Sequence, residues 1–546
     1  MRFVIDALRN NPTVTSMSFY ESQIDENTLK YIIETLKYNK TLATLTLIAN
    51  GIDADKIKLL ATGLQENKTL ANLELFKNNI GDDGVQHLAN ALKQNATLFK
   101  LSLHENEFHV DGAKYLADML RENKILTILN ISGNNIGDIG AQDLAMALQA
   151  NKTLTTLYLI DNNFGDEGAN HLATALRINK TLSTLFLMRN YIEDKGAQYL
   201  SEVLRNNQTL TTLILHNNRI SDSEINYLDD SLQENETLTT LGLVDNTINI
   251  DGAKYLADIL QQNKTLTTFV LGGNSLGDEG IKHISDALHS NHTLRTLCLI
   301  NGSFRDEGLK HLADTLRENK VSLVRISLFI FIFIFQTLTT LVLYENNISN
   351  DGAQYFSDAL KQNQTLSTLA FIGNGINENG AKSIADILQN NQALLILAIH
   401  NNGIGDNGIK YIADALQNNN TLTTISLCNA SITDDGIIHL ATKLQLNNTL
   451  RKLDLNDGSV SFGARDHLRA ITRKRKTPIT VYYSFFAFKV LNEIDTDPPP
   501  YIQENLLCNT AQHFTEMLPE MQIFPDFTEF LNNLNYYTTR KMLMLI

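Results

Sequence analysis

Apolar residues recur at fixed spacings along most of this chain. In the stretch 151–178 they include Leu154, Leu157, Leu159, Phe164, Leu172 and Leu176. Tyr158 lies between two of these leucines, and such alternation is typical of a strand, whereas Leu172 and Leu176 share one face of a helix because they lie four residues apart. The pattern therefore predicts one strand followed by one helix.

This strand-helix unit returns every 28 residues. An asparagine opens each unit, at Asn11, Asn39, Asn67, Asn95, Asn123, Asn151, Asn179, Asn207, Asn235, Asn263, Asn291 and Asn319. Neither element can bury its apolar side alone, so we expect about sixteen units to stack around one continuous core. The predicted fold class is α/β, a horseshoe-shaped solenoid with a parallel sheet on the concave face and helices on the convex face.

The polar positions of the unit are first assigned structural roles. Asp166 is expected to cap the N-terminus of its own helix, and Asn179 to end that helix in the left-handed conformation. The Asn before the turn, for example Asn162, is expected to point inward and to satisfy backbone groups of successive repeats. We expect looser turns where this series is interrupted, at Gly302, Ala430 and Gly458.

One segment departs from the period. The next opening asparagine after Asn319 is Asn363, and removing the sixteen residues 321–336 restores the register. The segment begins Val-Ser and ends Phe-Ile-Phe-Gln, which the splice-site sequences GTAAGT and TTTCAG can encode. We hypothesise that 321–336 is an unspliced intron of the gene prediction; the alternative is a loop at the helix-to-strand corner. Sequencing a transcript across codons 319–338 distinguishes the two.

The repeats are expected to span residues 1–483. The chain starts within a unit, so either the half-helix at 4–11 serves as a cap or the gene prediction lacks an upstream segment. Ile479 and Val481 are predicted to close the sheet as a partial last strand. Residues 484–546 form a tail that contains most of the prolines of the chain, and we assign it no function.

Two sequence segments of the unit resemble a known family. Asn-Lys-Thr-Leu-Thr-Thr-Leu (151–157) and Gly-Asp-Glu-Gly-Ala (165–169) are similar to ribonuclease-inhibitor-like leucine-rich repeats. Such repeats also form the repeat arm of NOD-like receptors and the body of Ran GTPase-activating proteins. The resemblance implies a solenoid with a protein partner on its concave wall, but it is barely specific for function.

The chain also departs from these relatives. It has three cysteines and no tryptophan, unlike ribonuclease inhibitor, and it lacks the Gly-x-x-x-x-Gly-Lys-Ser/Thr phosphate loop that NOD-like receptors carry. The resemblance to ribonuclease inhibitor is therefore architectural. At most, the chain corresponds to the repeat arm of a NOD-like receptor.

Composition changes this picture only slightly. The formal net charge of −15 follows largely from acids repeated at helix starts, so it says little about a basic partner. We recognise no signal sequence and no transmembrane stretch near about 20 residues, and the cysteines look unpaired. We therefore expect a cytoplasmic protein with neither a membrane nor a nucleic acid as its partner.

Candidate catalytic and metal sites are unconvincing. His104 and His109 lie five residues apart rather than four, so they do not fit the zinc-protease motif. Residues 161–166 look like the start of a calcium loop, but Leu172 stands where the bidentate Glu belongs. The cysteines show no paired metal spacing. We expect a non-enzymatic protein without a cofactor or a metal site.

The varying positions of the predicted concave wall are the candidate protein-binding site. They form an outward apolar stripe, with Tyr158, Phe186, Met188 and Tyr344 as anchors and with Asp161, Arg189, Asp245 and Glu345 as a charged rim. The predicted site residues are Tyr158, Ile160, Phe186, Met188, Arg189, His216, Val270, Ile300, Tyr344, Ile372 and His400. The alternative is that these residues are β-prone filler with no specific partner.

These observations favour a protein-binding scaffold or regulatory protein. One alternative is a GTPase-activating protein of the Ran type, in which Arg189, Arg295 or Arg451 reaches a bound GTPase. Another is an inhibitor of a basic enzyme, which the apolar wall argues against. The sequence identifies neither the partner nor the pathway nor the oligomeric state.

Overall fold

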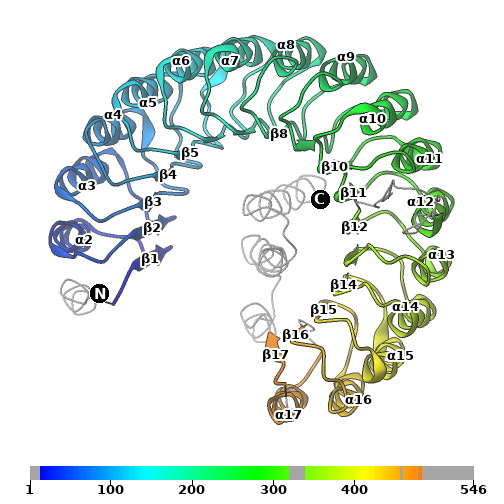
Figure 1. The fold of residues 1–546 in the computed structure, drawn as a ribbon. Coiled ribbons are helices and arrows are strands. Elements are labelled where there is room, and N and C mark those ends of the chain that lie inside the picture. The colour runs from blue at the N-terminus through cyan, green and yellow to red at the C-terminus, as the bar shows by residue number, and fades with distance from the viewer. Residues whose placement is uncertain (1–12, 319–337, 456–458, 476, 483–546) are drawn as a thin grey trace, which may run out of the picture. The chain divides into compact units, whose positions relative to one another are not determined.

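The computed structural model describes residues 13–318, 338–455, 459–475 and 477–482. The chain divides into two compact units, Met1–Thr267 and Thr268–Ile546. In each unit, strands line the inner face and helices the outer face (Figure 1). The half-helix at 4–11, the insert at 321–336 and the tail at 484–546 lie outside the described residues.

The first unit alternates strands and helices as predicted. In chain order they are β1 (Ser16–Tyr20), α2 (Glu26–Tyr38), β2 (Thr44–Ile48), α3 (Ala54–Glu66), β3 (Asn72–Glu74), α4 (Gly81–Leu92), β4 (Lys100–Ser102), α5 (Val110–Glu122), β5 (Ile128–Asn130), α6 (Gly137–Ala150), β6 (Thr156–Tyr158), α7 (Asp166–Ile178), β7 (Thr184–Phe186), α8 (Asp194–Leu204), β8 (Thr212–Ile214), α9 (Asp222–Leu232), β9 (Thr240–Gly242) and α10 (Ile250–Gln262). Consecutive strands from β1 to β9 pair in parallel, and each residue faces the one 28 positions later.

The second unit continues the same alternation. Its elements are β10 (Thr268–Gly272), α11 (Gly277–Leu288), β11 (Thr296–Ile300), α12 (Asp306–Glu318), β12 (Thr340–Tyr344), α13 (Asn350–Leu360), β13 (Thr368–Ile372), α14 (Glu378–Asn390), β14 (Ile396–His400), α15 (Gly405–Asn418), β15 (Thr424–Ser426), α16 (Asp434–Leu444), β16 (Lys452–Asp454), α17 (Phe462–Arg473) and β17 (Thr480–Tyr482). Strands β10 to β17 also pair in parallel. Strand β17 confirms the partial last strand predicted at Ile479 and Val481.

The second unit keeps its strand register across the predicted insert. Thr296 in β11 pairs with Thr340 in β12, 44 residues later, and Arg295 and Thr339 show the same separation. Elsewhere in the unit the step is 28 residues, as between Thr340 and Thr368. The excess equals the length of 321–336, so both sides of the insert occupy their normal positions in the repeat.

The core is built from the periodic leucines. Leu157, Leu159, Leu172 and Leu176 are at most 2% exposed. Stacking buries them because each repeat presents the same apolar positions to its neighbours. This outcome confirms the strand-helix reading of the unit.

The inward-pointing asparagines are confirmed. The Nδ2 atom of Asn162 donates to the carbonyl oxygens of Ile131 and Ile160, both at 3.1 Å, and its backbone N–H donates to Oδ1 of Asn190 at 3.0 Å. One buried amide therefore links three successive turns. Where glycine interrupts the series, the N–H of Gly302 still donates to Oδ1 of Asn346 at 2.8 Å. The looser turns expected at such positions stay a prediction, and Gly458 lies outside the described residues.

The predicted cap at Asp166 is wrong. Gly165 is the N-cap of α7, and no side chain caps this helix from within. Oδ1 of Asp166 instead accepts the N–H groups of Glu193 and Gly196, both at 2.8 Å, at the start of α8 in the next repeat. The acid caps its neighbour because stacking brings the two helix starts together, and the favourable placement of an acid at a helix N-terminus is preserved.

The predicted left-handed ending at Asn179 is also wrong. This residue is extended, with φ −65° and ψ 133°. Its Oδ1 accepts from the N–H of Leu182 at 2.7 Å, and its Nδ2 donates to the carbonyl oxygen of Leu148, also at 2.7 Å. Asn179 therefore closes the helix-to-strand corner and joins it to the preceding repeat, which requires an extended backbone and a buried amide.

Candidate protein-binding site

The wall is the inner side of the strands. Because successive side chains of a strand point to opposite faces, Tyr158 and Ile160 project from the side opposite to Leu157 and Leu159. The same alternation places every predicted site residue except Arg189 on this wall. Each wall residue faces its equivalent in the next repeat, as Tyr158 faces Phe186.

The exposure predicted for the apolar stripe is wrong. Tyr158 is 2% exposed, Phe186 3% and Met188 1%. The other buried members of the stripe are Ile160, His216, Val270, Ile300, Ile372 and His400. Part of this burial comes from contacts between repeats, since the rings of Tyr158 and Phe186 stack with their centroids 4.4 Å apart and their planes 5° apart. The stripe is a packed layer.

Tyr344 is the stripe member that stays partly accessible. It is half-buried at the end of β12, and Glu345 beside it is exposed. Burial, followed by the charge of Glu345 and a hydrogen bond to it, raises the pKa of the Tyr344 phenol well above its ordinary value. This tyrosine is therefore a neutral hydrogen-bonding group at physiological pH.

The charged rim lies in left-handed turns within three residues of the strand ends. Asp161, Arg189, Asp245 and Glu345 have φ between 52° and 55°. Arg189 Nε lies 3.4 Å from Asp161 Oδ2, and both side chains are half-buried. Left-handed backbone is unusual for residues other than glycine and asparagine, so the turn geometry holds these charges in place.

Accessible aromatic residues also occur near the start of the first unit, where sequence reasoning placed none. Tyr20 is 61% exposed, and Phe76 is half-buried with its ring centroid 4.6 Å from that of His104. Glu74, two residues before Phe76, forms a partly exposed ion pair with Lys100 at 3.1 Å. The sequence signal was available, because Phe76 occupies the same repeat position as the predicted wall residues Ile160 and Met188.

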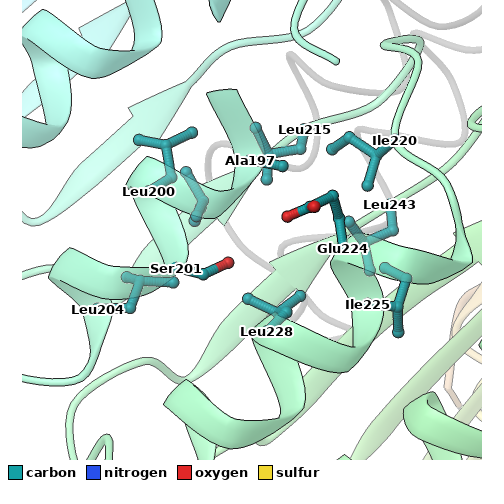
Figure 2. A pocket seen from close by; sticks show the side chains of 11 residues that line it. Ala197, Leu200, Ser201, Leu204, Leu215, Ile220, Glu224, Ile225, Leu228 and Leu243 are labelled. Carbon is teal, nitrogen blue, oxygen red and sulfur yellow. The ribbon is translucent and has the colours of Figure 1, made fainter. Parts of the chain in front are cut away.

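A narrow cavity in the first unit contains an acid that sequence reasoning missed. Helices α8 and α9 and strand β8 line it, and its lining is apolar apart from Ser201 and Glu224 (Figure 2). Glu224 stands where neighbouring helices carry Gly196 and Gly252. Burial, followed by the charges of Asp194 and Asp166, raises the pKa of Glu224 to about 7.

The cavity holds a titrating proton rather than a catalytic set. Glu224 is the one carboxyl among its lining residues. Elsewhere, the two histidines weighed as zinc ligands do not converge, because His104 contacts Glu105 at 3.1 Å whereas His109 lies 3.8 Å from Asp82.

The lengths and compositions of the helices bear on the expectation that no segment crosses a membrane. In the part of the chain that the structure describes, no helix combines the length and the apolar character that a membrane span requires.

Comparisons with known proteins agree with this architecture. A family model described as a leucine-rich repeat matches residues 66–89, 122–145, 150–173, 234–257, 262–285, 336–357 and 390–413. No curated protein is detectably similar to the chain.

Two solved structures are similar at low identity. One is leiomodin-1 actin-binding site 2, with a TM-score of 0.25 and 20% identity, over 28% of this chain and 87% of that chain. The other is the complex of Rad7 and Elc1 in yeast, with a TM-score of 0.41 and 17% identity, over 78% of this chain and 92% of that one. On the family match and its own strand-helix order, the chain contains leucine-rich repeats and folds as an α/β solenoid of parallel strands and helices.

Proposed function

We propose that this chain is a non-enzymatic scaffold or regulatory protein that binds another protein on the concave wall of its repeats. The observation that carries the proposal is the contrast between a monotonous scaffold and a varied wall. The asparagine positions repeat from unit to unit, whereas the wall positions vary and include the aromatic residues Tyr158, Phe186 and Tyr344. Aromatic side chains are the commonest anchors of protein interfaces.

The packed stripe supports binding as a rigid platform. Side chains that are already held by their neighbours, such as the stacked rings of Tyr158 and Phe186, lose little freedom when a partner arrives. We place the first contacts at the accessible aromatic residues Tyr344, Tyr20 and Phe76. The half-buried Arg189 and the exposed Glu345 then orient the partner.

The finer assignments belong to the same proposal. The repeats are of the ribonuclease-inhibitor-like type, similar to the repeat arm of NOD-like receptors, in a cytoplasmic protein. Residues 1–483 form the repeat region, 321–336 are an unspliced intron, and 484–546 are a tail. The Ran-type alternative is separated from the proposal by a GTP-hydrolysis assay with candidate GTPases.

A pull-down from cell lysate tests the proposal. The full chain is compared with Tyr344→Ala and with the double variant Tyr20→Ala/Phe76→Ala, and retained proteins are identified by mass spectrometry. The control variants are Tyr227→Ala and Tyr411→Ala, since these tyrosines are 47% and 40% exposed on helices α9 and α15.

We expect a partner whose recovery falls about tenfold or more in a wall variant and stays unchanged in the controls, as hot-spot truncation predicts. Capture of the same proteins by all variants would show that the wall is filler. Phe186 is unsuitable as a probe because it is 3% exposed and its substitution would disturb packing.

A further inference from the structure

Three side chains able to bind a metal ion meet on the wall of the second unit. His400 ends β14, Cys428 lies two residues after β15, and Asp454 ends β16. In the strand register Ala398 faces Ser426 and Ser426 faces Asp454, so the three strands are adjacent. Among the described residues this is the one group of at least three such side chains that converges.

The distances within this group suit a small ion. One ligand atom from each of the three side chains lies within 4.8 Å of the other two, and Cys428 Sγ is 3.1 Å from Asp454 Oδ2. Tetrahedral zinc holds its ligand atoms roughly 3.3–3.8 Å apart, given bond lengths of about 2.0–2.3 Å. The largest separation in the group therefore exceeds this range by about 1 Å at most.

A serine lies at the centre of the group. Ser426 Oγ is 2.5 Å from His400 Nε2, donates to Asp454 Oδ2 at 3.0 Å, and lies 3.6 Å from Cys428 Sγ. All four side chains are at most 2% exposed. The hydroxyl of Ser426 is thus placed to act as a fourth ligand.

The donor set fits zinc-class ions by charge and by softness. A thiolate, an imidazole and a carboxylate are ligands that Zn²⁺ accepts together, and hard ions such as Mg²⁺ and Ca²⁺ prefer oxygen alone. With neutral His400, one thiolate and one carboxylate cancel the charge of a divalent ion. That balance matters because an uncompensated charge is costly in a buried site.

A catalytic triad is a poorer interpretation of the same contacts. In a triad the acid orients the histidine and the histidine contacts the nucleophile. Here Asp454 contacts Ser426 and Cys428, whereas His400 contacts Ser426. In these contacts the acid meets the hydroxyl of Ser426 and the thiol of Cys428, which is the arrangement of a ligand cluster.

The rest of the wall provides an internal reference. Cys298 is also buried at a wall position, but it faces Val270 and Val342 in the neighbouring strands. Equivalent positions near the cluster carry Ala370 and Ala398. Cys298 therefore has aliphatic side chains on both neighbouring strands, whereas Cys428 lies next to Ser426 and Asp454.

We propose that His400, Cys428 and Asp454 bind a divalent transition-metal ion of the zinc class, which ties the last repeats together. Binding converts the Cys428 thiol to a thiolate and releases its proton to solvent, and no electron is transferred. The ion crosslinks β14, β15 and β16 from the wall side. This site was hidden from motif searches because its ligands lie about one repeat apart.

Metal content tests the proposal directly. The full chain is incubated with Zn²⁺, desalted and analysed by inductively coupled plasma mass spectrometry. We expect about one zinc ion per chain in the unmodified protein and in Cys298→Ser, and about tenfold less or lower in Cys428→Ser and Asp454→Asn. Circular dichroism identifies any variant that fails to fold. If one of the two ligand variants does not fold, the other still tests the site.

Cobalt supplies a second readout. With Co²⁺ in place of Zn²⁺, a thiolate ligand gives a near-ultraviolet charge-transfer band, which we expect in the unmodified chain, in Cys298→Ser and in Cys508→Ser but not in Cys428→Ser. The proposal would be overturned if the unmodified chain retained no more zinc than the folded Cys428→Ser variant. It would also be overturned by a band that survives in Cys428→Ser and disappears in Cys508→Ser.

Discussion

His216 and His400 occupy the same position of the repeat, one in each unit, and their surroundings differ. His216 lies against Gly242, and its Nδ1 accepts the N–H of Val244 at 2.7 Å. His400 lies against Ser426 in a cluster with a thiol and a carboxylate. The scaffold fixes where each imidazole sits, and the residues one repeat further along fix its chemistry.

The buried acids of the two units differ in the same way. Glu224 projects into an apolar cavity of the first unit (Figure 2), whereas Asp454 in the second unit accepts hydrogen bonds from Ser426 and Cys428. Glu224 is 5% exposed and Asp454 1%. Burial disfavours the charged form of a carboxyl that stands alone in the core. In a cluster, hydrogen bonds from neighbouring polar groups offset that cost.

The largest expected effect is the acid sensitivity conferred by His216. Burial lowers the pKa of His216 to about 3 from an ordinary 6.5. As pH decreases, the imidazole is therefore protonated in the unfolded chain before it is protonated in the folded chain. The free energy of unfolding falls between pH 6.5 and 3, by about 4 kcal/mol. We expect His216→Gln to lose this contribution, as measured by urea unfolding at several pH values.

The slope with pH is the quantity to compare, because a packing loss in His216→Gln shifts the curve without tilting it. His171→Gln serves as a control for removing a histidine from a helix. An unchanged acid slope in His216→Gln would contradict the burial of His216 as a neutral imidazole.

Glu224 is expected to act in the opposite direction. Its pKa is about 7 in the folded chain and about 4.5 when exposed, so the folded state keeps the proton longer. The free energy of unfolding should fall as pH rises from 4.5 to 7, by about 3 kcal/mol, and stay level above that. Glu224→Gln should remove this slope and stabilise the protein at pH 8.

Glu224→Gly provides a matched variant. In the preceding repeat an aspartate accepts the glycine N–H, since Asp166 accepts that of Gly196 at 2.8 Å. Asp194 accepts from Ser221 at 2.8 Å, and among the described residues it forms no such bond to the N–H of Glu224. Glycine at 224 should restore the bond. A variant as pH-sensitive as the unmodified chain would contradict the assignment.

Gly242 tests the packing around His216. A Cβ atom on Gly242 would approach His216 Cε1 and lie 2.8 Å from its Nε2. We expect Gly242→Ala to cost about 2 kcal/mol, as overpacking does in a tight site. His216→Ala should rescue most of that loss in the double variant, and the thermodynamic cycle measures the coupling. Additive losses would show that the two residues do not compete for space.

The fold was predictable because its signals are local and repeated. Leu157 and Leu172 follow strand and helix periods, and Asn162 has backbone groups as its natural partners wherever the turn is placed. The register across 321–336 was predictable as well, since the repeat resumes unchanged at Thr340.

The features that were missed depend on contacts between repeats. Asp166 caps a helix that begins 28 residues later, and only the stacking distance shows that its carboxylate reaches Gly196. The His400 and Cys428 pair forms no local metal-binding motif, because its members lie 28 residues apart in the sequence. Comparing equivalent positions of successive repeats would have found both, as well as Glu224 in place of glycine.

The smallest expected effect concerns an ion pair that is partly exposed and therefore differs from both the single and the clustered buried groups. Arg189 Nε and Asp161 Oδ2 lie 3.4 Å apart, with 26% and 28% of the two side chains exposed. Water screens such a pair, so Arg189→Gln should cost about 0.5 kcal/mol or less in stability, and less still at high salt. Urea unfolding at low and high salt measures this, with Arg177→Gln as the control because Arg177 pairs with Glu202 at 3.7 Å on the helical face. If Arg189 orients a partner, its substitution should weaken capture in the pull-down, whereas Arg177→Gln should not. A stability loss as large as that of Gly242→Ala would instead place Arg189 with the buried groups, and its role would be structural.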